Sequence, residues 1–243
     1  MTISFVGTNY HGSQIQQNAV TVQSEFQIAL KKTIGSLPDI KCCSRTDSGV
    51  HANRYCISFS TECKIPVEKL PIALNTELPP DIRALSVRHV PDDFHARYDC
   101  VKKRYVYKVW NSKIMDPFMY GRALQFIRHI DEHKLNETAQ IFVGTHDFEA
   151  MCSSKCDAES TVRTVYDFSV TRENELVLFS VSADGFLYNM VRIMVGTLLS
   201  CAREKLSTED IKNVLNTKKR INLCMTAPSE GLYLDDVIYN FTE

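Results

Sequence analysis

The sequence predicts an α+β fold made of two halves that use antiparallel sheet. Two observations support this prediction. Helix-like and strand-like segments alternate along both halves, and several neighbouring strands are joined by short polar turns, as in hairpins. No linker rich in Pro, Gly or Ser divides the 243 residues. Element order alone therefore places the boundary, between residues 1–98 and 99–243.

The first half begins with a short strand, residues 3–7, and continues into a helix. In the helical segment TVQSEFQIALKKTIG, Thr21 suits the N-cap and Gly35 suits the stop. One face of this helix is apolar, formed by Val22, Phe26, Ala29 and Leu30. Strands are expected over 54–60 and 82–90, the second after the breaker LPPD.

The second half begins with KRYVYKVWN, where Tyr105, Tyr107 and Val109 alternate with residues of the opposite face, as in a half-buried strand. Ser207 has an acid three residues on, which is the spacing of a capping box. Gly144 is expected to end the helix that precedes it. The remaining expected elements are a helix over 131–142, strands over 161–171 and 175–183, helices over 186–205 and 207–216, and a strand over 231–240.

Composition restricts the class of protein. A hydrophobic content of 44% can fill a core, and no stretch approaches the roughly 20 apolar residues of a membrane span. The first residues lack a signal-peptide pattern, so we expect a soluble, intracellular protein whose nine cysteines are reduced. The net charge of −1 excludes a uniformly basic surface but not a local basic patch. The runs ARYDCVKKRYVYK and NTKKRIN are, taken alone, more often solvated faces.

Most sequence signatures of chemistry are absent. His146, Cys152 and Cys156 form the nearest metal-like cluster, but they lack the paired spacing of zinc ligands. The chain contains no G-x-S-x-G, no P-loop and no dinucleotide fingerprint. We therefore expect neither a metal nor a nucleotide cofactor.

Two features remain to be explained. Asp47 stands in SRTDSGVH beside Gly49, a pattern that on its own is more often an ordinary turn. Arg192 stands in the apolar run NMVRIMVGTLL. A buried guanidinium there needs a carboxylate or phosphate partner, because an unpaired buried charge costs several kcal/mol. An arginine that points to solvent from an amphipathic helix is the alternative.

These residues belong to a longer pattern. SRTDSGVHA at 44–52 resembles the signature loop of the TruA family of tRNA pseudouridine synthases, whose usual form is G-R-T-D-x-G-V-H-A. Six further segments resemble other elements of the family, in the family's order and over nearly the whole chain. They are GTNYHG, TVQSEFQIAL, VPDDFHARYDCVKKRYVYKVWN, FVGTHDFEAMC, FLYNMVRIMVGTLL and TAPSEGLYLDDVIY.

The resemblance implies a fold and a reaction. The fold has two ferredoxin-like (RRM-like) α/β halves, joined into one long antiparallel sheet with a central active-site cleft, usually in a homodimer. The reaction isomerises uridine to pseudouridine at positions 38, 39 and 40 of the tRNA anticodon stem-loop, without metal or cofactor. A cytoplasmic setting is expected from the compact chain without extensions, with an organellar relative that has lost its targeting peptide as the alternative.

The resemblance also assigns residues. Asp47 matches the catalytic carboxylate, Arg192 the arginine that pairs with it, and Tyr105 the tyrosine that stacks on the flipped base. Whether the carboxylate attacks C1′, attacks the base or removes the 2′ proton stays open. Tyr107 is interpreted as structural. Contacts to RNA are expected, on charge and position, from Arg45, Lys102, Lys103, Arg104 and Arg163.

The chain departs from the family pattern at Ser13, where Trp is common, and at Ser44, where the loop usually begins with Gly. Two alternatives are kept beside the main interpretation. One is a catalytically silent tRNA-binding or chaperone relative with the same fold, which the joint presence of Asp47, Arg192 and Tyr105 disfavours. The other is a metal-dependent enzyme centred on the His146 cluster.

Overall fold

The computed structural model describes residues 1–153, 159–222 and 224–240, and they form two compact units. The first unit contains Met1–Val101 together with the chain from Tyr233 onward, and the second contains Lys102–Leu232. The last strand therefore belongs to the first unit, whereas the sequence placed all of 99–243 in the second half. No helix among the described residues is long and apolar enough to cross a bilayer.

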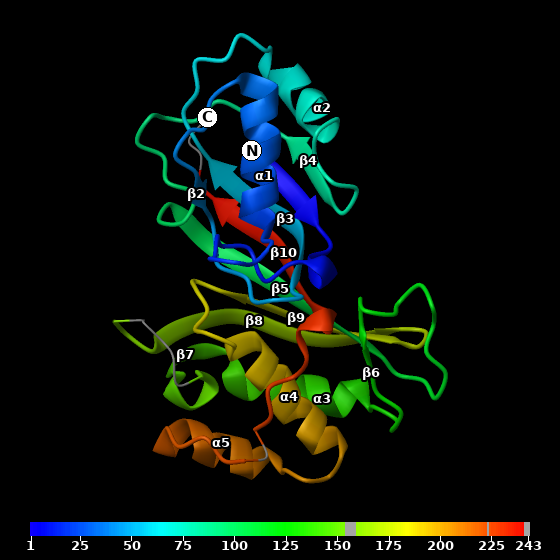
Figure 1. Ribbon diagram of the computed structural model, residues 1–243. Coiled ribbons are helices and arrows are strands. Elements are labelled where there is room, and N and C mark those ends of the chain that lie inside the picture. Colours follow the sequence, from blue (N-terminus) through cyan, green and yellow to red (C-terminus); the bar gives the residue numbers. More distant parts are fainter. Residues whose placement is uncertain (154–158, 223, 241–243) are drawn as a thin grey trace. The chain divides into compact units, whose positions relative to one another are not determined.

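The sheet of the first unit runs in the order β4, β1, β3, β10 (Figure 1). Its strands are β1 (Thr2–Phe5), β3 (His51–Ser58), β4 (Ile82–Ser86) and β10 (Leu232–Tyr239), and the short β2 (Lys41–Cys42) pairs with β3. β1 is antiparallel to both β3 and β4, whereas β10 is parallel to β3. A parallel pair is possible here because β3 and β10 are joined through the whole second unit and not by a hairpin turn.

Two helices belong to the first unit, α1 (Val22–Ile34) and α2 (Leu70–Asn75). The capping of α1 confirms the prediction: the Thr21 side chain accepts from the backbone of Ser24, which bonds back, and Gly35 ends the helix at φ 77°. The predicted apolar stripe is buried, formed by Val22, Phe26, Ala29 and Leu30. The sequence did not predict α2, a helix of only six residues.

The sheet of the second unit runs in the order β5, β9, β8, β7, with β6 paired to β5. Its strands are β5 (Cys100–Trp110), β6 (Leu124–Gln125), β7 (Gly144–Asp147), β8 (Val162–Glu173) and β9 (Leu176–Ala183). Its helices are α3 (Glu132–Ala139), α4 (Met190–Ala202) and α5 (Thr208–Thr217). The α+β class predicted from element order is confirmed. Each sheet is mixed and not wholly antiparallel as expected, because β10 is parallel to β3 and β6 is parallel to β5.

The alternation predicted for β5 is also observed. Tyr105, Tyr107 and Val109 are buried, and the latter two lie opposite Phe179 and Val177 of β9. Other predictions at element ends are wrong. β3 begins at His51 and β4 ends at Ser86, whereas strands were expected over 54–60 and 82–90. Gly144 begins β7 and does not cap a helix, and the helix expected over 186–205 begins only at Met190. The delay arises because Asn189, at φ 62°, has a left-handed backbone that a helix interior does not accept.

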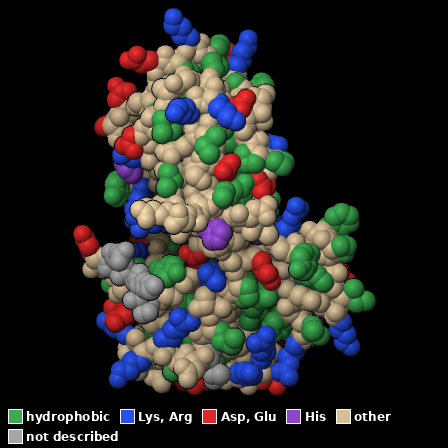
Figure 2. Space-filling model, viewed as in Figure 1, with side chains coloured by type: hydrophobic (Ala, Val, Ile, Leu, Met, Phe, Trp, Pro, Cys, Tyr) green, Lys and Arg blue, Asp and Glu red, His purple; other side chains and the backbone are tan. Residues whose placement is uncertain are grey.

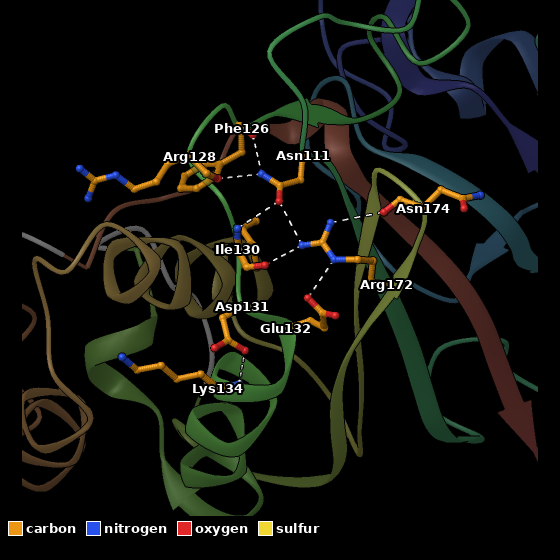
Figure 3. A network of polar contacts seen from close by, with 9 residues as sticks. All are labelled: Asn111, Phe126, Arg128, Ile130, Asp131, Glu132, Lys134, Arg172 and Asn174. Atoms are coloured by element: carbon orange, nitrogen blue, oxygen red, sulfur yellow. Dashed lines mark hydrogen bonds and ion pairs between the residues drawn. The ribbon is translucent and has the colours of Figure 1, made fainter.

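Within the second unit, a network of hydrogen bonds and one ion pair joins the long β5–α3 connection to β8 (Figure 3). Arg172 on β8 donates from Nε to Glu132 (2.8 Å) and from Nη2 to Asn111 Oδ1 (3.1 Å) and the Ile130 carbonyl (2.6 Å). Asn111 in turn donates to two carbonyls of the same connection, at 2.7 Å each. One arginine therefore holds the end of β5 and the start of α3 together.

This network predicts a pH-dependent contribution to stability. The hydrogen bond from Arg172 holds the pKa of the Glu132 carboxyl below its usual 4.5. The Glu132 carboxyl is therefore more acidic in the folded chain than in the unfolded chain. Its contribution to stability is complete above the usual pKa and is lost as the pH falls through the lower pKa of the folded state. Because the pair is partly exposed, we expect Glu132→Gln to lower the free energy of unfolding at pH 7 by up to about 1 kcal/mol.

Urea unfolding of both proteins between about pH 7 and pH 3 measures this difference, which should shrink below pH 4.5. Glu209→Gln is the matched control, because the Glu209 side chain is 83% exposed and faces Lys212 at 3.7 Å. A difference for Glu132→Gln that stays constant across this range would contradict the prediction.

Candidate active site

The Asp47 loop of the first unit is a tight turn. Val50 N donates to the Asp47 carbonyl (3.1 Å), and Gly49 has a φ of 79°, which glycine adopts without steric cost. Asp47 is half-buried, Arg45 is exposed, and Val50, directly before β3, is buried. The turn expected from the sequence is thus present, with the carboxylate at its first position.

The segment between β1 and α1 holds this loop through backbone carbonyls and through the Ser13 side chain. The carbonyl of Tyr10 accepts from Gly49 N (3.2 Å) and from Ser48 Oγ (3.3 Å). Ser13 meets Thr46 in both directions: Ser13 Oγ accepts from Thr46 N (2.8 Å), and Ser13 N donates to the Thr46 carbonyl (3.1 Å). The loop is therefore fixed on both sides of Asp47.

Two glycines make this approach possible. A Cβ at Gly7 would lie 1.9 Å from the Val50 carbonyl oxygen. A Cβ at Gly12, where φ is +90°, would lie 2.5 Å from the Thr46 carbonyl oxygen. Real side chains do not tolerate such distances, so the GTNYHG motif is a structural requirement of the Asp47 loop.

Two buried side chains of β3, His51 and Tyr55, contact the segments that form and hold the Asp47 loop. His51 is fully buried, accepts from Gly7 N at Nδ1 (3.0 Å) and stacks on Tyr233 with ring centroids 4.5 Å apart. The Tyr55 hydroxyl donates to the Ser44 carbonyl, and its complete burial raises the Tyr55 pKa well above the usual value. Tyr55 therefore stays a neutral donor beneath the loop.

Arg192 lies in the first turn of α4, in the second unit. Its Nε donates to the Ala227 carbonyl (2.8 Å) and its Nη1 to Asn189 Oδ1 (2.7 Å), while Ala227 N donates back to the Arg192 carbonyl (3.0 Å). The side chain is half-buried and directed by protein acceptors. The alternative in which Arg192 simply points to solvent is therefore wrong.

Tyr105 and Tyr107 share one face of β5 but have different surroundings. Tyr105 is 6% exposed and meets Phe186 edge-on, with centroids 5.1 Å apart at 84°. Tyr107 is fully buried, and its hydroxyl donates to the Pro228 carbonyl (2.7 Å). Burial raises the Tyr107 pKa, so its hydroxyl stays a donor. Its environment is that of a structural side chain, as interpreted from the sequence.

The basic residues expected to contact RNA differ in their exposure and in the protein groups that they contact. Lys102 pairs with Asp167 (3.2 Å) and lies over the Tyr166 ring. Arg163 Nη1 donates to the carbonyls of Ser160 and Val162 (2.8 and 2.6 Å). Lys103 is half-buried, whereas Arg104 and Arg45 are exposed. Figure 2 shows Lys and Arg side chains mixed with acidic ones on the visible face.

The residues of the metal alternative have other partners. His146 Nε2 bonds to the Val143 carbonyl (2.9 Å), and Cys152 Sγ contacts the Ser153 carbonyl (3.4 Å). Cys156 lies outside the described residues. Within residues 1–153, 159–222 and 224–240, no three His, Cys, Asp or Glu side chains are grouped so as to hold a metal ion.

Comparison with known proteins gives the family. A sequence model of the family described as "tRNA pseudouridine synthase" matches residues 1–99 and 138–240. The tRNA pseudouridine synthase A of a Thermoanaerobacter species is 42% identical over 239 residues, which cover 98% of this chain and 98% of that protein. The chain belongs to the TruA family of tRNA pseudouridine synthases.

A second TruA relative, the tRNA pseudouridine synthase A of Staphylococcus aureus, is also 42% identical, over 241 residues that cover 99% of this chain and 90% of the relative. Among solved structures, a chain of a Cbf5-Nop10-Gar1 complex is 11% identical with a TM-score of 0.36, over 81% of this chain and 52% of that chain. That likeness is too weak to support an argument.

Sequence reasoning missed the residues that support the TruA signature loop. Tyr10, His51 and Tyr55 were not singled out, and Ser13 was noted only as a departure from the family pattern. The signal that could have found them is the pair of glycines in GTNYHG, because glycine permits a backbone to lie close to another segment.

The structural role of Tyr107 is testable. Tyr107→Phe removes the donor to the Pro228 carbonyl and leaves that acceptor without its partner, so we expect a loss of about 1–2 kcal/mol in the free energy of unfolding. Urea titration measures it. Tyr120→Phe is the control, because Tyr120 is 80% exposed and its variant should stay within about 0.5 kcal/mol of wild type. Equal effects of the two substitutions would refute the role.

Proposed function

We propose that this TruA-family protein converts uridine to pseudouridine in tRNA, with Asp47 as the catalytic carboxylate. The observation that carries the proposal is the held loop: Asp47 occupies the first position of a turn whose backbone is fixed by Tyr10 and Ser13. Such fixation is what a reacting group requires, because rate depends steeply on its position. The relatives named tRNA pseudouridine synthase A support tRNA as the substrate.

The isomerisation needs no external reactant. The bond from N1 of uracil to C1′ of the ribose breaks, a bond from C5 to C1′ forms, and the hydrogen on C5 is lost while N1 gains one. Breaking a glycosidic bond develops positive charge on the sugar, and a carboxylate beside the ring stabilises it or adds to it, as in glycosidases. Asp47 is the residue we assign to this step.

Arg192 is proposed as the cation that pairs with Asp47, as the family pattern implies. An adjacent guanidinium favours the ionised carboxylate that a nucleophile or base requires. The support from this chain is that Arg192 is directed by the Asn189 amide oxygen and the Ala227 carbonyl, neither of which carries a formal charge. These two contacts hold the guanidinium in a defined orientation, which a cation that pairs with a reacting carboxylate requires.

The remaining substrate contacts follow from residue type. Tyr105 is proposed to stack on the flipped uracil, because an aromatic face offsets part of the cost of unstacking the base. Arg45, Lys103, Arg104 and Arg163 are proposed to contact the RNA backbone. The resemblance further leads us to propose action on uridines 38, 39 and 40 of the anticodon stem-loop, a homodimer, and a cytoplasmic location.

Replacement of Asp47 tests the proposed chemistry. With tRNA tritiated at uracil C5, wild type should release tritium, and Asp47→Asn and Asp47→Ala should release it more slowly by about 10³-fold or more. Asp92→Asn, an exposed acid of the same unit, is the matched control and should match wild type. If wild type releases none but binds tRNA, the silent RNA-binding alternative holds. If the Asp47 variants remain active, the assignment of Asp47 is wrong.

Salt dependence tests the proposed phosphate contacts. The affinity of the Asp47→Asn protein for tRNA should fall linearly with salt on logarithmic axes between roughly 50 and 200 mM, because each neutralised phosphate releases counterions. Lys103→Ala on that background should reduce the slope by about 0.7–0.9. Lys32→Ala is the control, since Lys32 lies on α1 and pairs with Glu77 at 3.4 Å. A flat salt dependence, or equal slopes for both lysine variants, would contradict the proposed contacts.

A further inference from the structure

We propose that Ser13 is a positioning residue for Asp47, an inference that rests on the proposed function. Ser13 bonds to both polar backbone groups of Thr46, the residue directly before Asp47: its Oγ accepts from Thr46 N (2.8 Å), and its own N donates to the Thr46 carbonyl (3.1 Å). The second of these groups belongs to the peptide unit that ends at the Asp47 nitrogen. Ser13 therefore fixes the plane of the peptide from which Asp47 projects.

Ser13 is itself held by a rigid element. The Ser13 carbonyl accepts from Gln23 N (3.1 Å) and the Gly12 carbonyl accepts from Val22 N (3.2 Å), both in the first turn of α1. The capping box at Thr21 fixes that turn in place. A continuous set of hydrogen bonds thus runs from the N-terminus of α1 through Ser13 to the Asp47 loop.

Burial makes the Ser13 hydroxyl difficult to replace. Ser13 is 2% exposed and Thr46 is 9% exposed, so water does not readily satisfy the Thr46 N–H if Oγ is removed. The Thr46 hydroxyl has no hydrogen-bond partner among the described residues. Among the described residues, Ser13 holds Thr46 by its backbone N–H and carbonyl, and the Thr46 side chain makes no hydrogen bond.

The residue type also matters. Trp, common at this position in the family, carries only an N–H donor and could not accept from Thr46 N. In this chain the acceptor for Thr46 N is supplied by the serine that stands at position 13.

The test compares two buried serines that make the same kind of bond. Ser13→Ala removes the acceptor for Thr46 N, and Ser58→Ala removes the acceptor for Ala96 N (3.1 Å) elsewhere in the same unit. Ser13→Gly is a second variant. It also removes the Ser13 hydroxyl and is used if Ser13→Ala does not fold. The measurements are kcat and KM for tritium release from C5-labelled tRNA, and hydrogen exchange of the Thr46 and Ala96 amides.

We expect Ser13→Ala to lower kcat by about 10–100-fold with KM changed less than about threefold, because a small misplacement of a reacting group slows chemistry more than binding. Exchange of the Thr46 amide should accelerate in this variant. Ser58→Ala should accelerate exchange at Ala96 and leave kcat within about twofold of wild type.

The controls separate the two levels of inference. If Asp47→Asn is inactive but Ser13→Ala and Ser13→Gly keep the wild-type kcat, the role of Ser13 is refuted and the proposed function stands. Equal losses of kcat in the Ser13 and Ser58 variants would also refute it, because they would indicate a general loss of packing. A wild-type protein that releases no tritium would overturn the proposed function itself.

Discussion

The site depends on one physical constraint, the close backbone contact between the segment after β1 and the loop before β3. At Gly7 and Gly12 this contact leaves no space for a side chain. Hydrogen bonds from Tyr10 and Ser13 then use the backbone groups that the contact brings into reach. The loop that carries Asp47 is thus held by close main-chain packing together with a buried side-chain acceptor, Ser13 Oγ.

The second unit directs its candidate residues by a related arrangement. The start of α4 and the segment at Ala227 bond to each other through the Arg192 backbone and side chain. Nearby, the Tyr107 hydroxyl holds the Pro228 carbonyl. In both units a loop near a candidate functional side chain is tied to a regular element by buried or partly buried hydrogen bonds. Such groups specify one geometry because leaving any of them unpaired costs free energy.

The charge distribution explains how a protein with a net charge of −1 is compatible with an RNA substrate. Several cations are already used within the protein: Lys102 pairs with Asp167, Lys218 with Asp147, and Arg172 with Glu132. Arg45 and Arg104 are exposed and stand near Asp47 and Tyr105 in the sequence. Attraction of tRNA would therefore depend on a few local cations and not on the overall charge.

The sequence by itself determined the features that depend on neighbours along the chain. The caps of α1 at Thr21 and of α5 at Ser207, the alternation in β5 and the turn at Gly49 were predictable because each is governed by residues a few positions apart. The family and the identity of Asp47, Arg192 and Tyr105 as candidates also came from motifs in the sequence. Their roles remain proposals.

Only the tertiary structure decided which distant residues support the site. Ser13 and Thr46 are 33 positions apart, and Arg192 and Ala227 are 35 positions apart. The parallel pairing of β10 with β3 and the left-handed backbone at Asn189, which delays α4, were likewise not predictable. The physical reason is that local propensity reports on a residue's near neighbours, whereas these contacts exist only once the core has packed and brought remote backbone groups within bonding distance.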